Sequence, residues 1–238
     1  MRRSALLLAL ALPAAACFPH PVLTADGRER VLRATAQQPS YLRVAVYVSP
    51  FFGDSSRVLL TDRPAAEVAA LRAADGKPIA SAVPERILPP GTPLFVTTVQ
   101  FPTGAALFTR PPSSPRFSPW LLAVADGEER TAVILLSAQA ETVEDLLAEI
   151  GRYLTSDDPG PAFRALPDGQ RTAVLKKELV DGMGRDAALM AWGYPERIVL
   201  APQARTEEWF WPQGRRHALF QDDRLVRYET AQEASPEP

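Results

Sequence analysis

The residue types that most often carry out catalysis or bind metals are few in this chain and lie far apart. Two histidines, His20 and His217, have no second histidine and no cysteine at the spacing of metal ligands. Cys17 is the single cysteine among 238 residues, which excludes an intramolecular disulfide and a cysteine cluster for zinc or iron–sulfur. The sequence therefore predicts no catalytic residue, no metal site and no cofactor.

The other candidate motifs fit turns better than active sites. The acid pairs Asp157-Asp158 and Asp222-Asp223 lie in turn contexts, whereas general acid–base pairs face each other across a cleft. Gly182-Met183-Gly184 follows a predicted helix and lacks the third glycine of a dinucleotide-binding loop. We interpret His217 as a surface or half-buried strand residue. An enzyme whose carboxylates are brought together only by folding stays open as an alternative.

The first sixteen residues have the pattern of a secretory signal peptide. Arg2 and Arg3 form a basic head, residues 4–12 are apolar, and three alanines precede Cys17. The apolar stretch is far shorter than the roughly 20 residues that a membrane-spanning helix needs. No other stretch of that length is both free of charges and predominantly apolar. We therefore expect residues 1–16 to be removed and predict no transmembrane helix.

The junction at Cys17 resembles the bacterial lipoprotein signal, the lipobox. Small residues followed by a cysteine at the end of a short apolar core carry the resemblance, although Ala14 stands where that family prefers leucine. The resemblance implies that Cys17 is lipidated and becomes the first residue of the mature chain. Phe18, rather than aspartate, follows it, which in enterobacterial sorting permits delivery to the outer membrane. The alternative is a plain secretory signal cut near Ala16, which leaves a free thiol.

Composition and charge narrow the class of protein further. Hydrophobic residues make up 46% of the chain and charged residues 23%, which is typical of a globular protein. The net charge of -2, with no lysine-rich run, argues against nucleic-acid binding. The 24 prolines favour loops and short strands over a helical bundle.

The N-terminal half is expected to be rich in strands. Residues 17–40 are predicted to be a lipidated tether, with a short strand within 31–36. Residues 41–155 are expected to form a small barrel or rolled sheet that ends in a helix. Alternating or apolar patterns predict strands at 42–48, 57–60, 94–99, 120–124 and 131–136, and helices from Asp62 and over 142–154. Asp126-Gly127 predicts a hairpin turn, and Thr142 with Asp145 predicts a capping box. The segment 88–96 resembles the turn-to-strand junction of bacterial Src-homology-3-like barrels.

The C-terminal part is expected to be a second α+β unit over 165–230, followed by a disordered tail at 231–238. Asp168 begins a predicted helix to Val180 that Gly182 stops, and a second helix covers 185–192. Three strands are predicted at 207–211, 216–220 and 224–228. Two helices packed on this three-stranded antiparallel sheet give an ααβββ arrangement.

This part resembles the BamE family, also called SmpA/OmlA, over about a quarter of the chain. The resemblance implies an ααβββ fold in an outer-membrane lipoprotein. Gly184 departs from the serine or threonine that the family commonly has after Gly-Met. The residues that carry the resemblance are Leu179-Val180-Asp181-Gly182-Met183, Trp192-Gly193-Tyr194-Pro195, Trp209-Phe210-Trp211, Ala218-Leu219-Phe220 and Asp223-Arg224-Leu225-Val226.

Two tryptophans are candidates for contact with a partner. Trp209 and Trp211 alternate with Phe210, so they share one face of a predicted strand. They either pack in the core or form an aromatic surface for a protein partner, with Arg215 and Arg216 as its polar rim.

Together these patterns predict a non-catalytic bacterial envelope lipoprotein. We expect a scaffold or assembly factor that acts through protein contacts, anchored by lipid to the outer membrane and facing the periplasm. Its expected partners are envelope proteins, with the outer-membrane assembly machinery as a candidate, and not nucleic acid. The alternative is a peptidoglycan- or ligand-binding envelope module that uses the N-terminal sheet.

Overall fold

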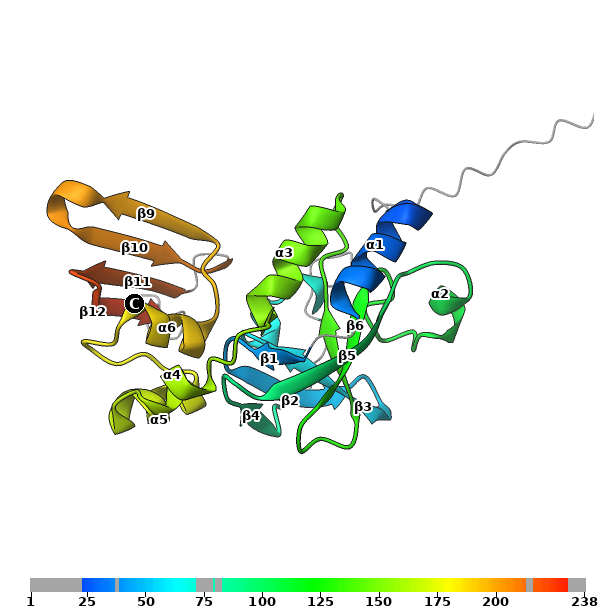
Figure 1. Cartoon of the computed structure of the whole chain (residues 1–238), viewed down its shortest axis with the longest axis horizontal. Helices are drawn as coiled ribbons and strands as arrows, with labels where there is room; N and C mark the ends of the chain where they lie inside the picture. Colours follow the sequence, from blue (N-terminus) through cyan, green and yellow to red (C-terminus); the bar gives the residue numbers. More distant parts are fainter. Residues whose placement is uncertain (1–22, 37–38, 72–78, 80–82, 213–215, 231–238) are drawn as a thin grey trace, which may run out of the picture.

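The computed structural model describes residues 23–36, 39–71, 79, 83–212 and 216–230. These residues form two lobes, each with a sheet of its own (Figure 1). The N-terminal lobe runs to β8 and the C-terminal lobe begins at α4. Among the described residues, no helix has both the length and the apolar character needed to cross a membrane.

The N-terminal lobe contains an open, mixed sheet of eight strands in the order β4-β2-β3-β7-β6-β5-β1-β8. Neighbouring strands are antiparallel except for the parallel pair β3 and β7. The bounds are β1 (Ser40–Leu42), β2 (Val46–Phe51), β3 (Asp54–Thr61), β4 (Arg86–Leu88), β5 (Pro93–Gln100), β6 (Trp120–Ala125), β7 (Thr131–Leu135) and β8 (Leu154–Thr155). The prediction of a small barrel is wrong, because the sheet ends on two different strands, β4 and β8, that do not pair. Turn signals give strand lengths, but they do not say whether the first and last strands meet.

Helices α1 (Ala25–Thr35) and α3 (Val143–Tyr153) pack against one face of this sheet (Figure 1). The predicted capping box of α3 is confirmed, since Asp145 N donates to Thr142 Oγ1 at 3.1 Å and Thr142 N donates to Asp145 Oδ2 at 3.0 Å. The tether and strand predicted before residue 40 are wrong where the chain is described. Thr24 caps α1 by accepting from Gly27 N, and Val31 is fully buried in the core. One buried valine gives a weak helical pattern, which explains the error.

Two predicted elements of the N-terminal lobe, one strand and one helix, are replaced by shorter elements. The strand predicted over 42–48 is divided into β1 and β2. Between them, Arg43 N donates to Tyr153 O, and Ala45 N donates to Met190 O at 2.8 Å. The helix predicted from Asp62 is replaced by two short 3₁₀ turns, η1 (Ala65–Glu67) and η2 (Ala69–Leu71). A short helix, α2 (Ala105–Thr109), lies in the β5–β6 connection.

The C-terminal lobe has three helices followed by an antiparallel sheet of four strands in the order β12-β11-β10-β9. The bounds are α4 (Gly160–Arg164), α5 (Asp168–Lys176), α6 (Arg185–Trp192), β9 (Arg197–Ala201), η3 (Pro202–Ala204), β10 (Thr206–Phe210), β11 (Arg216–Gln221) and β12 (Arg224–Thr230). The ααβββ prediction is therefore wrong, because the described sheet has β9 as a fourth strand. Helix α5 also ends earlier than predicted, at Lys176 rather than Val180, and Lys177 follows it in the left-handed conformation with φ of 59°.

Tryptophan side chains form much of the core of the C-terminal lobe. Trp192 of α6 meets Trp211 edge to face at 5.0 Å between ring centres, and Trp209 packs on Phe220 at 4.5 Å. Aromatic pairs at these separations stabilise a core beyond the apolar area that they bury. These residues hold α6 against β10 and β11.

Candidate functional site

A group of buried polar side chains joins the two lobes, and we call it the interlobe cluster. The N-terminal lobe and the C-terminal lobe both contribute to it. Its members are Asp62, Arg63, Glu67, Tyr153, Lys177 and Arg216.

Asp62 is the most heavily bonded acid of the interlobe cluster. It follows β3 and is 1% exposed. Arg63 donates Nε to Oδ1 and Nη2 to Oδ2, both at 2.9 Å, and the Tyr153 hydroxyl donates to Oδ1 at 3.0 Å. Burial raises the pKa of Asp62, but the hydrogen bonds and charge of Arg63, with the charge of Lys177, outweigh burial and hold the pKa below its ordinary value. Asp62 is therefore an anion inside the protein.

Lys177 reaches from the end of α5 across the boundary between the lobes. Its Nζ donates to Ala45 O at 2.6 Å and to Asp62 O at 2.8 Å, and no carboxylate among the described residues accepts from it. Burial lowers the pKa of Lys177 to about 7, with Asp62 opposing that shift and Arg216 and Arg63 adding to it. A neutral amine still has two N–H donors, so both carbonyl bonds survive loss of the proton.

Arg216 and Glu67 form a second buried ion pair in the interlobe cluster. Arg216 Nε donates to Glu67 Oε2 at 3.0 Å, and Nη2 lies 2.8 Å from the same oxygen. The guanidinium also lies over the ring of Trp192, 5.0 Å from its centre. Trp192 in turn donates Nε1 to Lys177 O at 3.0 Å, which ties the ion pair to the end of α5.

Gly193 allows the close approach of the two lobes at Asp62. Its φ is +75°, a conformation that glycine adopts without strain. A Cβ at this position would lie 2.8 Å from Asp62 Oδ2, closer than carbon and oxygen atoms pack. The carbonyl of Gly193 accepts from Trp211 Nε1 at 3.2 Å, which fixes this turn against β10.

The geometry of the interlobe cluster fits a structural role better than catalysis. With Lys177 neutral, the charges of Asp62 and Glu67 balance those of Arg63 and Arg216. Two surface cavities have volumes of about 260 and 220 Å³, and no residue of the cluster lines either. Both volumes fall below the roughly 300–1,000 Å³ typical of small-molecule sites. Within the described ranges, no three His, Cys, Asp or Glu residues are grouped to hold a metal ion.

The structure buries the aromatic residues that the sequence suggested for partner binding. Trp209 and Trp211 are 3% and 1% exposed, and Arg216 is buried in its pair with Glu67. They form part of the core and of the interlobe cluster, so a partner cannot contact them on the surface. Arg215 and Cys17 lie outside the described residues.

The surface that stands out instead is β9, which sequence analysis missed. All five of its residues are exposed, including the apolar side chains of Ile198, Val199 and Leu200. β9 is the last strand of its sheet, and no described strand lies on its outer side (Figure 1). The run Ile-Val-Leu after Pro195 is a signal for a strand that could have found it. What no local pattern reveals is that both faces of this strand stay open.

The faces of β9 follow from its register with β10. Ile198 pairs with Trp209, and Leu200 pairs with Glu207, which forms a salt bridge with Arg185 of α6. Ile198 and Leu200 therefore lie on the helix side of the sheet. Val199 lies on the outer side with its pair Glu208. Apolar side chains on both faces of a free edge make β9 a candidate surface for pairing with another strand.

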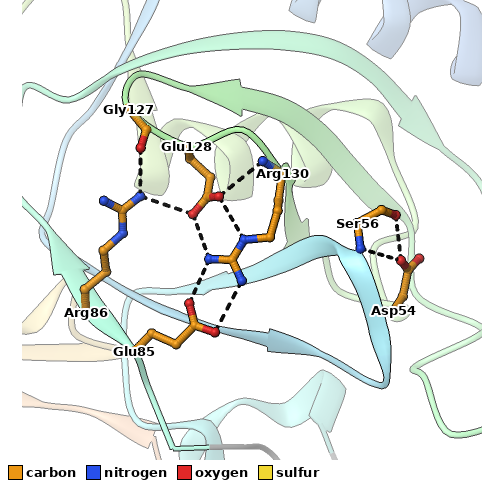
Figure 2. A network of polar contacts seen from close by, with 7 residues as sticks. All are labelled: Asp54, Ser56, Glu85, Arg86, Gly127, Glu128 and Arg130. Atoms are coloured by element: carbon orange, nitrogen blue, oxygen red, sulfur yellow. Dashed lines mark hydrogen bonds and ion pairs between the residues drawn. The ribbon is translucent and has the colours of Figure 1, made fainter.

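A separate polar network, drawn in Figure 2, fixes the edge strand β4 to the β6–β7 turn. Arg130 donates to both oxygens of Glu85 and both oxygens of Glu128. Arg86 donates Nη2 to Glu128 Oε2 at 3.1 Å and to Gly127 O at 3.3 Å. Opposite charges alternate around the network, so it stabilises this edge and offers no vacant charge to a ligand.

Glu128→Gln is expected to lower the free energy of unfolding by about 1 kcal/mol at pH 7, since two arginines lose their shared carboxylate. Hydrogen bonds from Arg130 lower the pKa of Glu128 to about 2 from an ordinary 4.5. Because the folded-state pKa is depressed, ionised Glu128 stabilises the folded protein fully above pH 4.5, and this stabilisation is lost as the pH falls toward 2. Urea unfolding at pH 7 and at pH 2.5 measures this, with the exposed neighbour in Glu129→Gln as control. Equal losses at both pH values would contradict the prediction.

Comparison with known proteins assigns no family to this architecture. No protein-family model matches the chain, and neither a curated protein nor a solved structure is found to be similar to it.

Proposed function

We propose that this protein is a non-catalytic bacterial envelope lipoprotein that acts as a scaffold or assembly factor, with the β9 edge as its protein-binding surface. Export and the lipid anchor rest on the leader and on Cys17. The sequence resemblance of the C-terminal part to the BamE family supports the same location at the outer membrane, although its sheet has β9 as a fourth strand.

The exposure of β9 is the observation that carries this proposal. Leu200 is 61% exposed and Ile198 is 47% exposed, although both are large apolar residues in a regular strand. A free strand edge offers main-chain donors and acceptors to an extended segment, and flanking side chains give specificity. The ligand-binding alternative has less support, because the cavity beside α1 and α3 has only about 220 Å³.

The anchor is tested by acyl-chain labelling of the wild-type chain and of Cys17→Ala, followed by membrane fractionation. We expect the wild type to take up label and to remain with the membrane. The variant is expected to lose both. Label and membrane association that persist in the variant would overturn the lipoprotein assignment.

The contact surface is tested by photo-crosslinking in intact cells. A benzophenone amino acid replaces Leu200 in one variant and Val83 in the other. Val83 is an even more exposed apolar residue in the N-terminal lobe and serves as the matched control. We expect a discrete crosslinked protein with the Leu200 variant and none with the Val83 variant. Equal labelling at both positions would mean that β9 has no special role.

A further inference from the structure

The two edges of the C-terminal sheet differ in their protection against pairing. β12, on one edge, carries Arg224, Arg227 and Glu229, and its register with β11 shifts between Leu219 and Phe220. Charges and bulges of this kind are how soluble proteins prevent edge-to-edge association. β9, on the other edge, has unbroken register with β10 over all five residues and no charge between Arg197 and Ala201. Only the β9 edge is left in a form ready to pair.

We propose that β9 pairs antiparallel with β9 of a second copy of this chain, about a two-fold axis at Val199. The two C-terminal sheets then join into one continuous sheet. This inference rests on the proposed function, since it names the occupant of the same edge. It makes the scaffold a symmetric dimer, the commonest closed assembly of soluble proteins.

The sequence of β9 is complementary to itself in this register. In this register Val199 lies opposite Val199 of the second copy. On the helix side, Ile198 lies opposite Leu200 of the second copy, and Leu200 lies opposite its Ile198. Each of the large apolar side chains of β9, those of Ile198, Val199 and Leu200, therefore meets an apolar side chain of the other copy. Cross-strand pairs of β-branched and apolar residues are the unit that stabilises a sheet.

Charges on the outer face also match in this register. Arg197 and Val199 lie on that face, because their pairs in β10 are Phe210 and Glu208. The guanidinium of Arg197 lies 4.0 Å from the centre of the Phe210 ring, and within the described chain no carboxylate forms a salt bridge with it. In the dimer, Arg197 of one copy lies opposite Ala201 of the other.

That position brings Arg197 near Glu208 of the second copy. The two Cα atoms lie two strand spacings apart and two residues along the strand, which is about 12 Å. Extended arginine and glutamate side chains span this separation. The two-fold axis repeats the contact, so each edge offers one cation and one anion to the other copy. A partner with an acidic edge of its own would not satisfy both groups.

The axis at Val199 gives a test that is specific for this register. In Val199→Lys, two lysines face each other across the axis, and in Val199→Glu two glutamates do. Each homodimer is repelled, with the dissociation constant raised at least about 100-fold. An equal mixture of the two variants places lysine opposite glutamate and restores a heterodimer. Val226→Lys, an exposed position on the opposite edge strand β12, is the matched control.

Sedimentation velocity of the purified full chain measures these masses. We expect dimers for the wild type and Val226→Lys, monomers for each Val199 variant alone, and dimers for their mixture. A monomeric wild type, or a mixture that stays monomeric while both variants keep wild-type circular dichroism, would overturn the inference. A monomeric wild type whose Leu200 variant still crosslinks to a different envelope protein would leave the proposed function standing. A dimer with the expected pattern among the Val199 variants, in a chain whose Cys17→Ala variant keeps its label and membrane association, would leave this inference standing and overturn the lipoprotein assignment.

Discussion

Asp62→Asn is expected to lower the free energy of unfolding by about 3–5 kcal/mol, the cost of removing one partner from a buried ion pair. The amide keeps the volume of the carboxylate, so the change isolates the charge. Arg63 then keeps two donors but loses its counter-ion. With Lys177 neutral, the interlobe cluster changes from electrically balanced to carrying one excess positive charge inside the protein. Urea unfolding at pH 8 measures the loss.

Two further variants separate charge from local disruption. Asp54→Asn changes another aspartate that pairs with an arginine, Arg57, at 3.4 Å on the surface (Figure 2 shows Asp54), and its cost is expected to stay within 1 kcal/mol. At pH 6, below its pKa of about 7, Lys177 carries positive charge, so adding Lys177→Met to Asp62→Asn there should cost less than the sum of the two single losses. Strict additivity, or an Asp62→Asn loss no larger than that of Asp54→Asn, would show that the buried charge does not matter.

Signals that lie within a few residues of each other predicted structure correctly. The capping box of Thr142 and Asp145 identified α3, and Asp126-Gly127 identified the hairpin of β6 and β7, where Gly127 has φ of +70°. Such signals depend on local hydrogen bonds and backbone conformation, which the residues themselves determine. They do not determine which strands become neighbours. The parallel pairing of β3 with β7, which helps to make the sheet open and mixed, has no local signal.

The interlobe cluster could not be predicted because its partners are far apart in sequence. Asp62 and Tyr153 are 91 residues apart, Ala45 and Lys177 are 132 apart, and Glu67 and Arg216 are 149 apart. The same contacts explain several local errors. Lys177 ends α5 in a left-handed conformation because its side chain and carbonyl are both held by the other elements of the cluster.

The interlobe cluster and the β9 edge serve the proposed function together. The cluster fixes the C-terminal lobe to the N-terminal lobe, which follows Cys17, the proposed site of the anchor, in the chain. Trp211, directly after β10, bonds to Gly193 in this fixed region, and Trp209 of β10 pairs with Ile198 of β9. A rigid attachment holds the β9 edge ready for pairing, so that binding costs less conformational entropy.

The buried amine of Lys177 is expected to make the protein more stable as the pH rises above neutrality. Its pKa is about 7 in the folded chain and near 10.5 when exposed, so between these values the unfolded chain binds the additional proton. The buried amine destabilises the folded protein most below pH 7, and this destabilisation disappears as the pH approaches 10.5. Between pH 7 and pH 9.5 the free energy of unfolding therefore rises by about 3 kcal/mol.

Lys177→Met isolates this contribution, because a methionine fills the site and cannot titrate. The difference in unfolding free energy between wild type and variant should change by about 3 kcal/mol in favour of the wild type between pH 7 and pH 9.5. Lys176→Met, which changes the exposed neighbouring lysine, should follow the wild-type curve at every pH. Parallel curves for wild type and Lys177→Met would mean that Lys177 keeps its proton in the folded protein. The interlobe cluster would then hold an unbalanced cation, and its carbonyl ligands, Ala45 O and Asp62 O, would have to stabilise a full charge.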